Sequence, residues 1–160
     1  MTKLDDLWLT GPVNDEQQII SPGLADKASN TVRRSIRHSG FSNFLAALFV
    51  PEFEGYIRRV AYAQNAVNMA RIAIALERYR LANGGYPASL DTLSPHYLPE
   101  VPHDVIGGQP LHYQATQDGL FVLYSIGWNE RDDGGTVALT RGKSAADPNG
   151  GDWVWRYPTK

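Results

Sequence analysis

Residues 52–83 contain no proline and are dominated in their second half by alanine, arginine, glutamate and leucine. Such a run favours a single helix, because these residue types lose little entropy in a helix and no residue interrupts the hydrogen bonds. With a rise of about 1.5 Å per residue, the predicted helix is about 48 Å long, which exceeds the width of a small domain. Asn83, Gly84 and Gly85 form a suitable C-terminal cap, and Pro87 prevents the helix from resuming.

Two apolar stripes run along this predicted helix. At about 100° per residue, one face gathers apolar side chains over the whole length, and a second stripe occupies only the C-terminal half. We therefore expect the C-terminal half to be buried on two sides and the N-terminal half to have one exposed apolar side. The first face comprises Phe53, Tyr56, Ile57, Val60, Ala63, Val67, Ala70, Ile74 and Leu81, and the second comprises Met69, Ile72, Leu76 and Tyr79.

The segment before the long helix has a different character. Residues 1–40 show no apolar periodicity, which predicts a largely irregular segment. Residues 41–50 form a short apolar run that predicts an amphipathic helix ended by Pro51. About twenty apolar residues are needed to cross a bilayer, so no membrane span is expected. The predicted organisation is an N-terminal extension over residues 1–51 and a globular domain over residues 52–160.

The pattern changes to β structure after residue 109. Residues 120–126 alternate between two faces and predict the strongest strand. Asp118 and Gly119 predict a hairpin turn that joins it to a strand over residues 111–115. Two more strands are predicted over residues 136–140 and 153–157. The expected fold class is α+β, with a long N-terminal α-helix packed on a small antiparallel sheet of about three to four strands.

The composition and spacing of reactive residues argue against several functions. With 15 basic and 17 acidic residues the chain lacks the basic excess of a nucleic-acid-binding protein. The absence of cysteine excludes disulfides, thiol catalysis and cysteine-ligated zinc. His96, His103 beside Asp104, and His112 are not spaced as zinc ligands, which favours surface positions. No nucleophile elbow, P-loop or dinucleotide-binding fingerprint is present, so we expect a non-catalytic protein.

Several short motifs follow one another in a distinctive order. They are Leu76-x-x-Tyr79 with Gly84-x-Tyr86-Pro87 at the end of the long helix, then residues 97–102, 108–113 and 123–129. In this order they resemble the globular domain of the major pseudopilin of type II secretion systems, the protein G type. The resemblance covers about residues 56–157 but lacks the N-terminal membrane anchor, since Leu45 stands at the position of the family's glutamate. It implies a pilin-like fold and a structural, extracytoplasmic role in a bacterial secretion or surface apparatus.

An acidic, glycine-rich loop occupies residues 126–135. Calcium takes about six to eight oxygen ligands from a flexible loop, and Gly134 and Gly135 allow the chain to curl. In the resembled family this loop binds Ca²⁺. By position, the resemblance implies ligands from the carbonyl of Ile126 and from the side chains of Asn129, Asp132, Asp133 and Asp152. The alternative is a solvated acidic turn held by Asx hydrogen bonds.

Three functions remain open from the sequence. The first is an assembly or interaction domain, whose long helix binds a second copy or a secretion or pilus component through Phe53, Ile57, Val60 and Val67. The second is an extracytoplasmic module that binds a glycan or peptide with the acidic loop and a group of aromatic residues. The aromatic group comprises Trp128, Trp153, Trp155 and Tyr157. Of these we assign Trp153 to the core, and we leave open whether Trp155 belongs to the core or to a binding surface. The third function is that of a small hydrolase.

Overall fold

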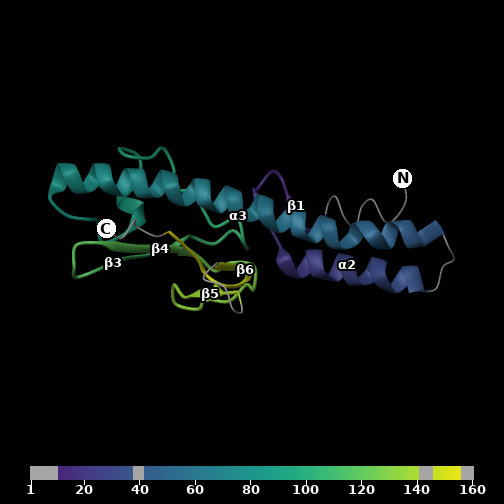
Figure 1. The fold of residues 1–160 in the computed structure, drawn as a ribbon. Coiled ribbons are helices and arrows are strands. Elements are labelled where there is room, and N and C mark those ends of the chain that lie inside the picture. The colour runs from purple at the N-terminus through teal and green to yellow at the C-terminus, as the bar shows by residue number, and fades with distance from the viewer. Residues whose placement is uncertain (1–10, 38–41, 141–145, 156–160) are drawn as a thin grey trace.

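A computed structural model describes residues 11–37, 42–140 and 146–155. One helix runs the length of the molecule, and the other elements pack along it (Figure 1). With 42 residues it is about 63 Å long at about 1.5 Å per residue. In chain order the elements are β1 (Val13–Asn14), β2 (Ile19–Ile20), α2 (Pro22–Arg37), α3 (Ser42–Asn83), the 3-10 helix η1 (Leu90–Leu93), β3 (His112–Ala115), β4 (Phe121–Ser125), β5 (Val137–Leu139), β6 (Ala146–Gly151) and β7 (Trp153–Trp155).

The α+β mixture is present, but the predicted pilin-like arrangement is wrong in two respects. The long helix α3 does not lie at the N-terminus, because β1, β2 and α2 precede it. The strands also form three small antiparallel sheets rather than one, in the orders β1-β2, β3-β4-β7 and β5-β6. β5 and β6 pair with each other and form a sheet separate from β3-β4-β7, which we call the central sheet.

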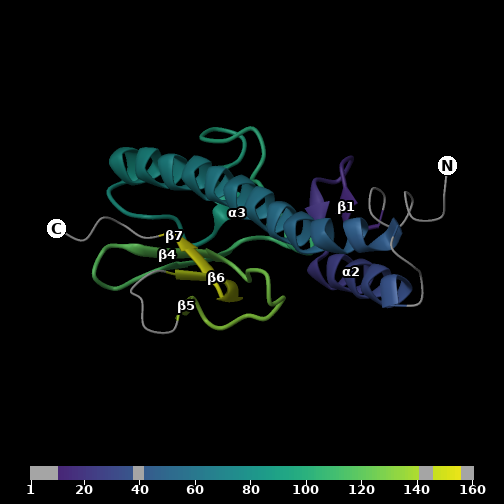
Figure 2. The same cartoon turned by 45° about the vertical axis from the view of Figure 1, so that its right-hand side comes forward.

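The helix α2 was missed because its first residues read as a turn. Pro22 is suited to the first turn of a helix, where its missing N–H costs no hydrogen bond. The carbonyl of Ser21 accepts hydrogen bonds from Leu24 N and Ala25 N and so starts the helix. α2 lies beside the first half of α3 and runs in the opposite direction (Figures 1 and 2). Beyond Pro22, the residues of α2 that the structure shows as buried are small, which allows close packing: Ala25, Ala28 and Ser29.

The prediction that Pro51 ends a separate apolar helix is also wrong. α3 begins at Ser42 and continues through Pro51 to Asn83. Proline removes one hydrogen bond from a helix interior and costs about 3 kcal/mol. Packing of α2 along this part of α3 gives the helix support that local sequence does not reveal. Residues 42–50 are therefore the first part of α3 and do not form a separate helix that could cover the rest of it.

α2, η1 and the β3-β4-β7 sheet all contact α3. α2 and the β3-β4-β7 sheet both lie on the same side of α3 (Figure 2). Met69, Ile72 and Leu76 of the second predicted stripe are buried there. Ile74 and Leu81 of the first stripe are exposed. The prediction that the C-terminal half is buried on two sides is therefore wrong, because the sheet is too small to wrap around the helix.

The predicted hairpin is confirmed. β3 and β4 pair antiparallel with Ala115 opposite Phe121, and the turn between them closes with a 2.9 Å hydrogen bond from Thr116 N to Leu120 O. Gly119 has a φ of 76°, a left-handed conformation that glycine adopts without strain. β7 pairs with the other edge of β4, with Trp153 opposite Ser125. The strand predicted over residues 136–140 is observed as β5.

The core lies between α3 and the β3-β4-β7 sheet. Its most buried apolar members are Ile72, Leu76, Leu93, Ile106 and Leu123. The N-terminal hairpin joins this core through Ile20, which is buried and whose N donates to Val105 O over 2.6 Å. Among the described helices, none has the length and apolarity that a bilayer crossing requires.

Candidate functional site

The acidic loop is organised by the carboxylate of Asp152, the residue directly before β7. Asp152 is buried, and its Oδ1 accepts a hydrogen bond from Asp133 N at 3.2 Å. Its Oδ2 accepts from Gly135 N at 2.6 Å and Thr136 N at 3.2 Å. Both oxygens of Asp152 therefore bind backbone N–H groups of the loop. A buried carboxylate needs such donors to offset the loss of its hydration.

The other predicted ligands also have partners within the loop. Asn129 Nδ2 donates to Asp133 Oδ2 over 2.8 Å, and Asn129 Oδ1 accepts from Arg131 N over 3.2 Å. Asp132 Oδ1 accepts from Gly134 N over 2.9 Å. These are the Asx hydrogen bonds of the alternative interpretation. The side chain of Ile126 packs partly buried against the core.

Two aromatic rings from the central sheet hold Asp132 from outside the loop. Tyr124 Oη donates to Asp132 Oδ1 over 3.1 Å, and His112 Nδ1 lies 3.5 Å from Asp132 Oδ2. His112 stacks on Tyr124 with ring centroids 4.8 Å apart. Partial burial and the bond to Asp132 raise the pKa of Tyr124 above its usual value. Three interactions lower the pKa of Asp132. The largest is the hydrogen bond from Gly134 N, followed by the hydrogen bond from Tyr124 Oη and the electrostatic interaction with His112.

Glu130 joins the loop to the N-terminal part of the chain. Its Oε2 accepts a hydrogen bond from Gly23 N over 3.1 Å, in the first turn of α2. A carboxylate at a helix N-terminus interacts favourably with the free N–H groups and the helix dipole. Glu130 has a φ of 54°, which is uncommon for a residue other than glycine. The loop therefore also serves as a contact between the sheet and α2.

The predicted calcium ligands thus lie close together, but most of their oxygens face N–H or O–H donors. Among the described residues, no group of three or more His, Cys, Asp or Glu side chains is placed to hold a metal ion. Both oxygens of Asp152 accept hydrogen bonds from backbone N–H groups of the loop, as the alternative interpretation expects. Calcium binding by the loop stays a prediction.

The lowered pKa of Asp132 predicts a pH-dependent stability. Because the folded-state pKa lies below the ordinary value of 3.8, ionised Asp132 stabilises the fold. This contribution is present above about pH 4 and disappears as the pH falls through the folded-state pKa. The difference in unfolding free energy between the wild type and Asp132→Asn should therefore shrink as the pH falls from neutral. Urea denaturation at a series of pH values measures this difference, and a pH-independent difference would contradict the prediction.

A buried polar network lies at the centre of the fold and was not predicted. Asp104 Oδ1 accepts hydrogen bonds from Asn65 Nδ2 at 2.7 Å, Ser125 Oγ at 2.9 Å and Ile106 N at 2.9 Å. Its Oδ2 accepts from Ile126 N at 3.1 Å. Asn65, Asp104 and Ser125 are all buried. The network therefore ties α3 to the connector and to the end of β4, and presents no reactive group to solvent.

One sequence signal could have revealed this network. Asn65 lies at helical spacing from Ala61, Met69 and Ile72, which are all buried. A polar residue on an otherwise apolar face indicates a buried hydrogen-bond partner. Asn65 Oδ1 accepts from Val105 N over 3.0 Å, so both ends of the amide are used.

His96, His103 and His112 lie in different parts of the described fold. His96 is exposed, and His103 Nε2 lies 3.4 Å from Gln18 O at the N-terminal hairpin. His112 lies on β3 beside Asp132. The three side chains make contacts in different parts of the fold, so they supply no shared set of metal ligands or acid–base groups.

The exposed side of α3 carries an apolar stripe, which we call the α3 stripe. Its exposed members are Tyr56 (62%), Val60 (44%), Val67 (53%), Ile74 (63%) and Leu81 (75%). Of the predicted partner-binding residues, Val60 and Val67 lie in this stripe, whereas Ile57 is half-buried against the core. Phe53 lies in α3, but its side chain is outside the part that the structure describes.

The aromatic residues contribute mainly to the core. Trp128 and Trp153 are buried, as predicted for Trp153, and Trp155 is partly buried against the core. Tyr157 lies outside the described residues. Tyr62 is exposed and packs edge-on against Trp153, with ring centroids 5.2 Å apart. No flat, exposed tryptophan face is therefore formed by the described tryptophans.

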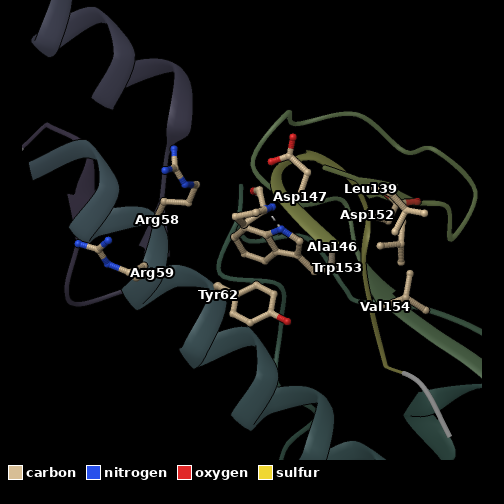
Figure 3. Close-up of a pocket in the computed structure, with 11 residues that line it drawn as sticks. Arg58, Arg59, Tyr62, Leu139, Ala146, Asp147, Asp152, Trp153 and Val154 are labelled. Carbon is tan, nitrogen blue, oxygen red and sulfur yellow. Dashed lines mark hydrogen bonds between the residues drawn. The ribbon is translucent and has the colours of Figure 1, made fainter. Parts of the chain in front are cut away.

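A cleft of about 620 Å³ lies between α3 and the last three strands (Figure 3). Arg58, Arg59 and Tyr62 of α3 form one wall. Trp153 lies at the base, where its Nε1 donates to Pro148 O over 3.3 Å. Asp147 lies on the opposite wall. The cleft has the size of a small-molecule or peptide side-chain site.

Comparisons of the chain with known protein families, with curated proteins and with solved structures give no match. A functional proposal therefore rests on the residues of the chain itself.

Proposed function

We propose that this chain is a non-catalytic interaction module that binds a helix of another molecule along the α3 stripe. The observation that carries the proposal is the spacing of its exposed apolar side chains. Val60, Val67, Ile74 and Leu81 follow one another at intervals of seven residues, and Tyr56 precedes Val60 by four residues, which is the complementary offset. Apolar residues repeated in this way form the seam between two packed helices.

Exposure of the α3 stripe supports this use of it. A monomeric protein rarely leaves a continuous apolar surface of this length uncovered, and such surfaces are typical of interaction sites. From Tyr56 to Leu81 the stripe extends for about 38 Å, or about seven helical turns. Neither α2 nor the central sheet covers it, since both pack on the other side of α3 (Figure 2). The partner in this proposal is a second copy or a component of a larger assembly.

The proposed cellular setting rests on the sequence resemblance alone. The resemblance of residues 56–157 to the major pseudopilin of type II secretion systems supports a role in a bacterial secretion or surface apparatus. It also supports an extracytoplasmic location. The α3 stripe then has the role of an assembly surface.

Replacing Val67 and Ile74 with aspartate should abolish this interaction without unfolding the protein. Both side chains are exposed, so their loss leaves the core intact. Two apolar contacts in a helix seam contribute about 3 kcal/mol, so the affinity should fall about 100-fold or more. The two measurements are sedimentation equilibrium for self-association, and fluorescence anisotropy with a labelled amphipathic helical peptide that has leucine in its seam and glutamine on its flanks.

A matched control variant, Ala88→Asp with Gln117→Asp, changes the net charge equally at exposed positions outside α3. It should bind as the wild type does. If the wild type neither self-associates nor binds the peptide, or if Val67→Asp with Ile74→Asp binds unchanged, the α3 stripe is not the interaction site.

A second candidate function is binding of a glycan or peptide in the cleft beside Trp153. The observation that favours it is the exposed Tyr62 ring over a cleft that also contains Arg58 and Arg59 (Figure 3). An aromatic edge and guanidinium groups suit a sugar or an acidic peptide. Glycan and peptide arrays should then give ligands whose binding is lost in Tyr62→Ala and kept in Tyr56→Ala, which lies outside the cleft. Ligands that bind both variants equally would contradict this candidate.

A further inference from the structure

The charges beside the α3 stripe are strongly one-sided. Between residues 55 and 83, α3 carries five arginines and one glutamate. At about 100° per residue, Arg59 lies along one edge of the stripe, and Arg71 and Arg78 lie along the other. All three are exposed. The surface that borders the stripe is therefore basic, although the whole chain has a net charge of −2.

The single glutamate of this segment does not offset the arginines along the stripe. Glu77 Oε2 accepts a 2.9 Å bond from Arg80, and its Oε1 accepts a hydrogen bond from Tyr86 Oη. Within the described part of the chain, neither Arg59 nor Arg71 has an ion-pair partner. Two guanidinium groups are thus available on opposite edges of an uncovered apolar seam.

We infer that the α3 stripe binds an amphipathic helix of a different protein whose apolar seam is bordered by glutamate or aspartate. This inference rests on the proposed function and specifies its partner. Residues that border the seam of two packed helices face each other, and opposite charges there select the partner. Pairing of two copies would instead bring two arginine-bordered stripes together. The charge pattern therefore disfavours self-association and favours an acidic partner helix.

The distance along the helix sets the size of the partner segment. Arg59 and Arg78 are about 28 Å apart along the axis, at about 1.5 Å per residue. A partner helix of about four heptads places carboxylates beside Arg59 and Arg71 while its apolar seam covers the stripe from Val60 to Leu81. Arg78 lies within the same span, but its Nη1 donates to Tyr97 O over 3.3 Å. The ion pairs lie at the rim of the contact, so they set specificity and are weakened by salt.

The test uses the full chain and synthetic helical peptides of about four heptads. The peptides share a leucine seam and differ only in their bordering residues, which are glutamate, lysine or glutamine. Fluorescence anisotropy should show that the glutamate peptide binds about tenfold more tightly than the lysine peptide, with the glutamine peptide between them. The preference should nearly vanish when NaCl rises from about 0.1 M to about 1 M, where the Debye length falls from about 10 Å to about 3 Å.

A charge-reversed variant makes the test reciprocal. Arg59→Glu with Arg71→Glu should prefer the lysine peptide over the glutamate peptide. A matched control, Lys27→Glu with Arg131→Glu, makes the same charge change at exposed positions outside α3 and should keep the preference of the wild type. Circular dichroism and thermal unfolding verify that each variant is folded.

The outcomes separate the two proposals. Equal binding of all three peptides, a preference that the charge reversal leaves unchanged, or self-association that is tighter than peptide binding would overturn the acidic partner and keep the α3 stripe as an interaction site. Binding of none of the peptides, without self-association, would overturn both proposals.

Discussion

Replacement of Asp104 with alanine is expected to lower the free energy of unfolding by about 3 kcal/mol or more. The carboxylate is buried and accepts hydrogen bonds from Asn65, Ser125, Ile106 and Ile126. Its removal takes the acceptor away from Ile106 N, from Ile126 N and from the buried Ser125 hydroxyl, and leaves Asn65 Nδ2 with Ser125 Oγ as its acceptor. Each unsatisfied buried group costs about 1–3 kcal/mol, so this substitution should be among the most destabilising in the chain.

Urea denaturation followed by circular dichroism measures this loss. Glu100→Ala, which removes an exposed carboxylate from the same connector, should change stability by less than about 0.5 kcal/mol. If Asp104→Ala does not fold, Ser125→Ala provides the measurement. It removes a donor to Asp104 and the acceptor of Gly127 N, and should cost about 1–3 kcal/mol. A cost for Ser125→Ala no larger than that for Glu100→Ala would show that the network does not stabilise the fold.

The elements that the sequence predicts well are those whose signal is local. Strand β4 alternates between buried Phe121, Leu123 and Ser125 and their partly buried neighbours, as the period of a strand requires. Asp118 and Gly119 mark the turn before it. Alternation and turn chemistry act within a few residues, so their outcome can be read without knowing the rest of the fold.

The course and burial of α3 depend on contacts that are distant in sequence. Pro51 is a helix breaker by local chemistry, yet α3 passes through it where α2 packs alongside. Both stripes of the helix are apolar, so periodicity alone could not tell which one the sheet would cover. Asn65 lies on the side of α3 that is buried, and its amide donates to Asp104. A polar residue at this position was therefore the one sequence signal that could have marked the buried side.

The sequence predicted which residues form the acidic loop, but it did not predict the hydrogen bonds that they make. The position of the acidic loop and of Asp152 was predicted, and the structure brings these residues together. β6 could not be foreseen, since residues 146–151 have little strand propensity and form a strand by pairing with β5. This pairing places Asp152 under the loop. Asp152 accepts from N–H groups of the loop because it is placed there by this pairing. The acidic composition of the loop does not reveal these donors.

Replacement of Asp152 with asparagine is expected to lower the free energy of unfolding by about 2–3 kcal/mol, even in EDTA. The carboxylate accepts from the N–H groups of Asp133, Gly135 and Thr136, and an asparagine places an NH₂ group against at least one of them. Because the partners of Asp152 are backbone donors, this cost needs no metal ion. Asp133→Asn is the matched control, since Asp133 is exposed and its side chain accepts only from Asn129 among the described residues. It should cost less than about 0.5 kcal/mol.

The same variants decide the role of calcium in the loop. Thermal unfolding of EDTA-treated protein is measured with and without added Ca²⁺, with Mg²⁺ as the control for selectivity. A calcium site made by the loop predicts that Ca²⁺ raises the Tm of the wild type and that both Asp133→Asn and Asp152→Asn lose this rise, because an ion that binds only the folded state stabilises it. An unchanged Tm together with a large cost of Asp152→Asn in EDTA would show that hydrogen bonds, and not a calcium ion, stabilise the loop. Equal stability of Asp152→Asn and Asp133→Asn in EDTA would contradict the role assigned to Asp152.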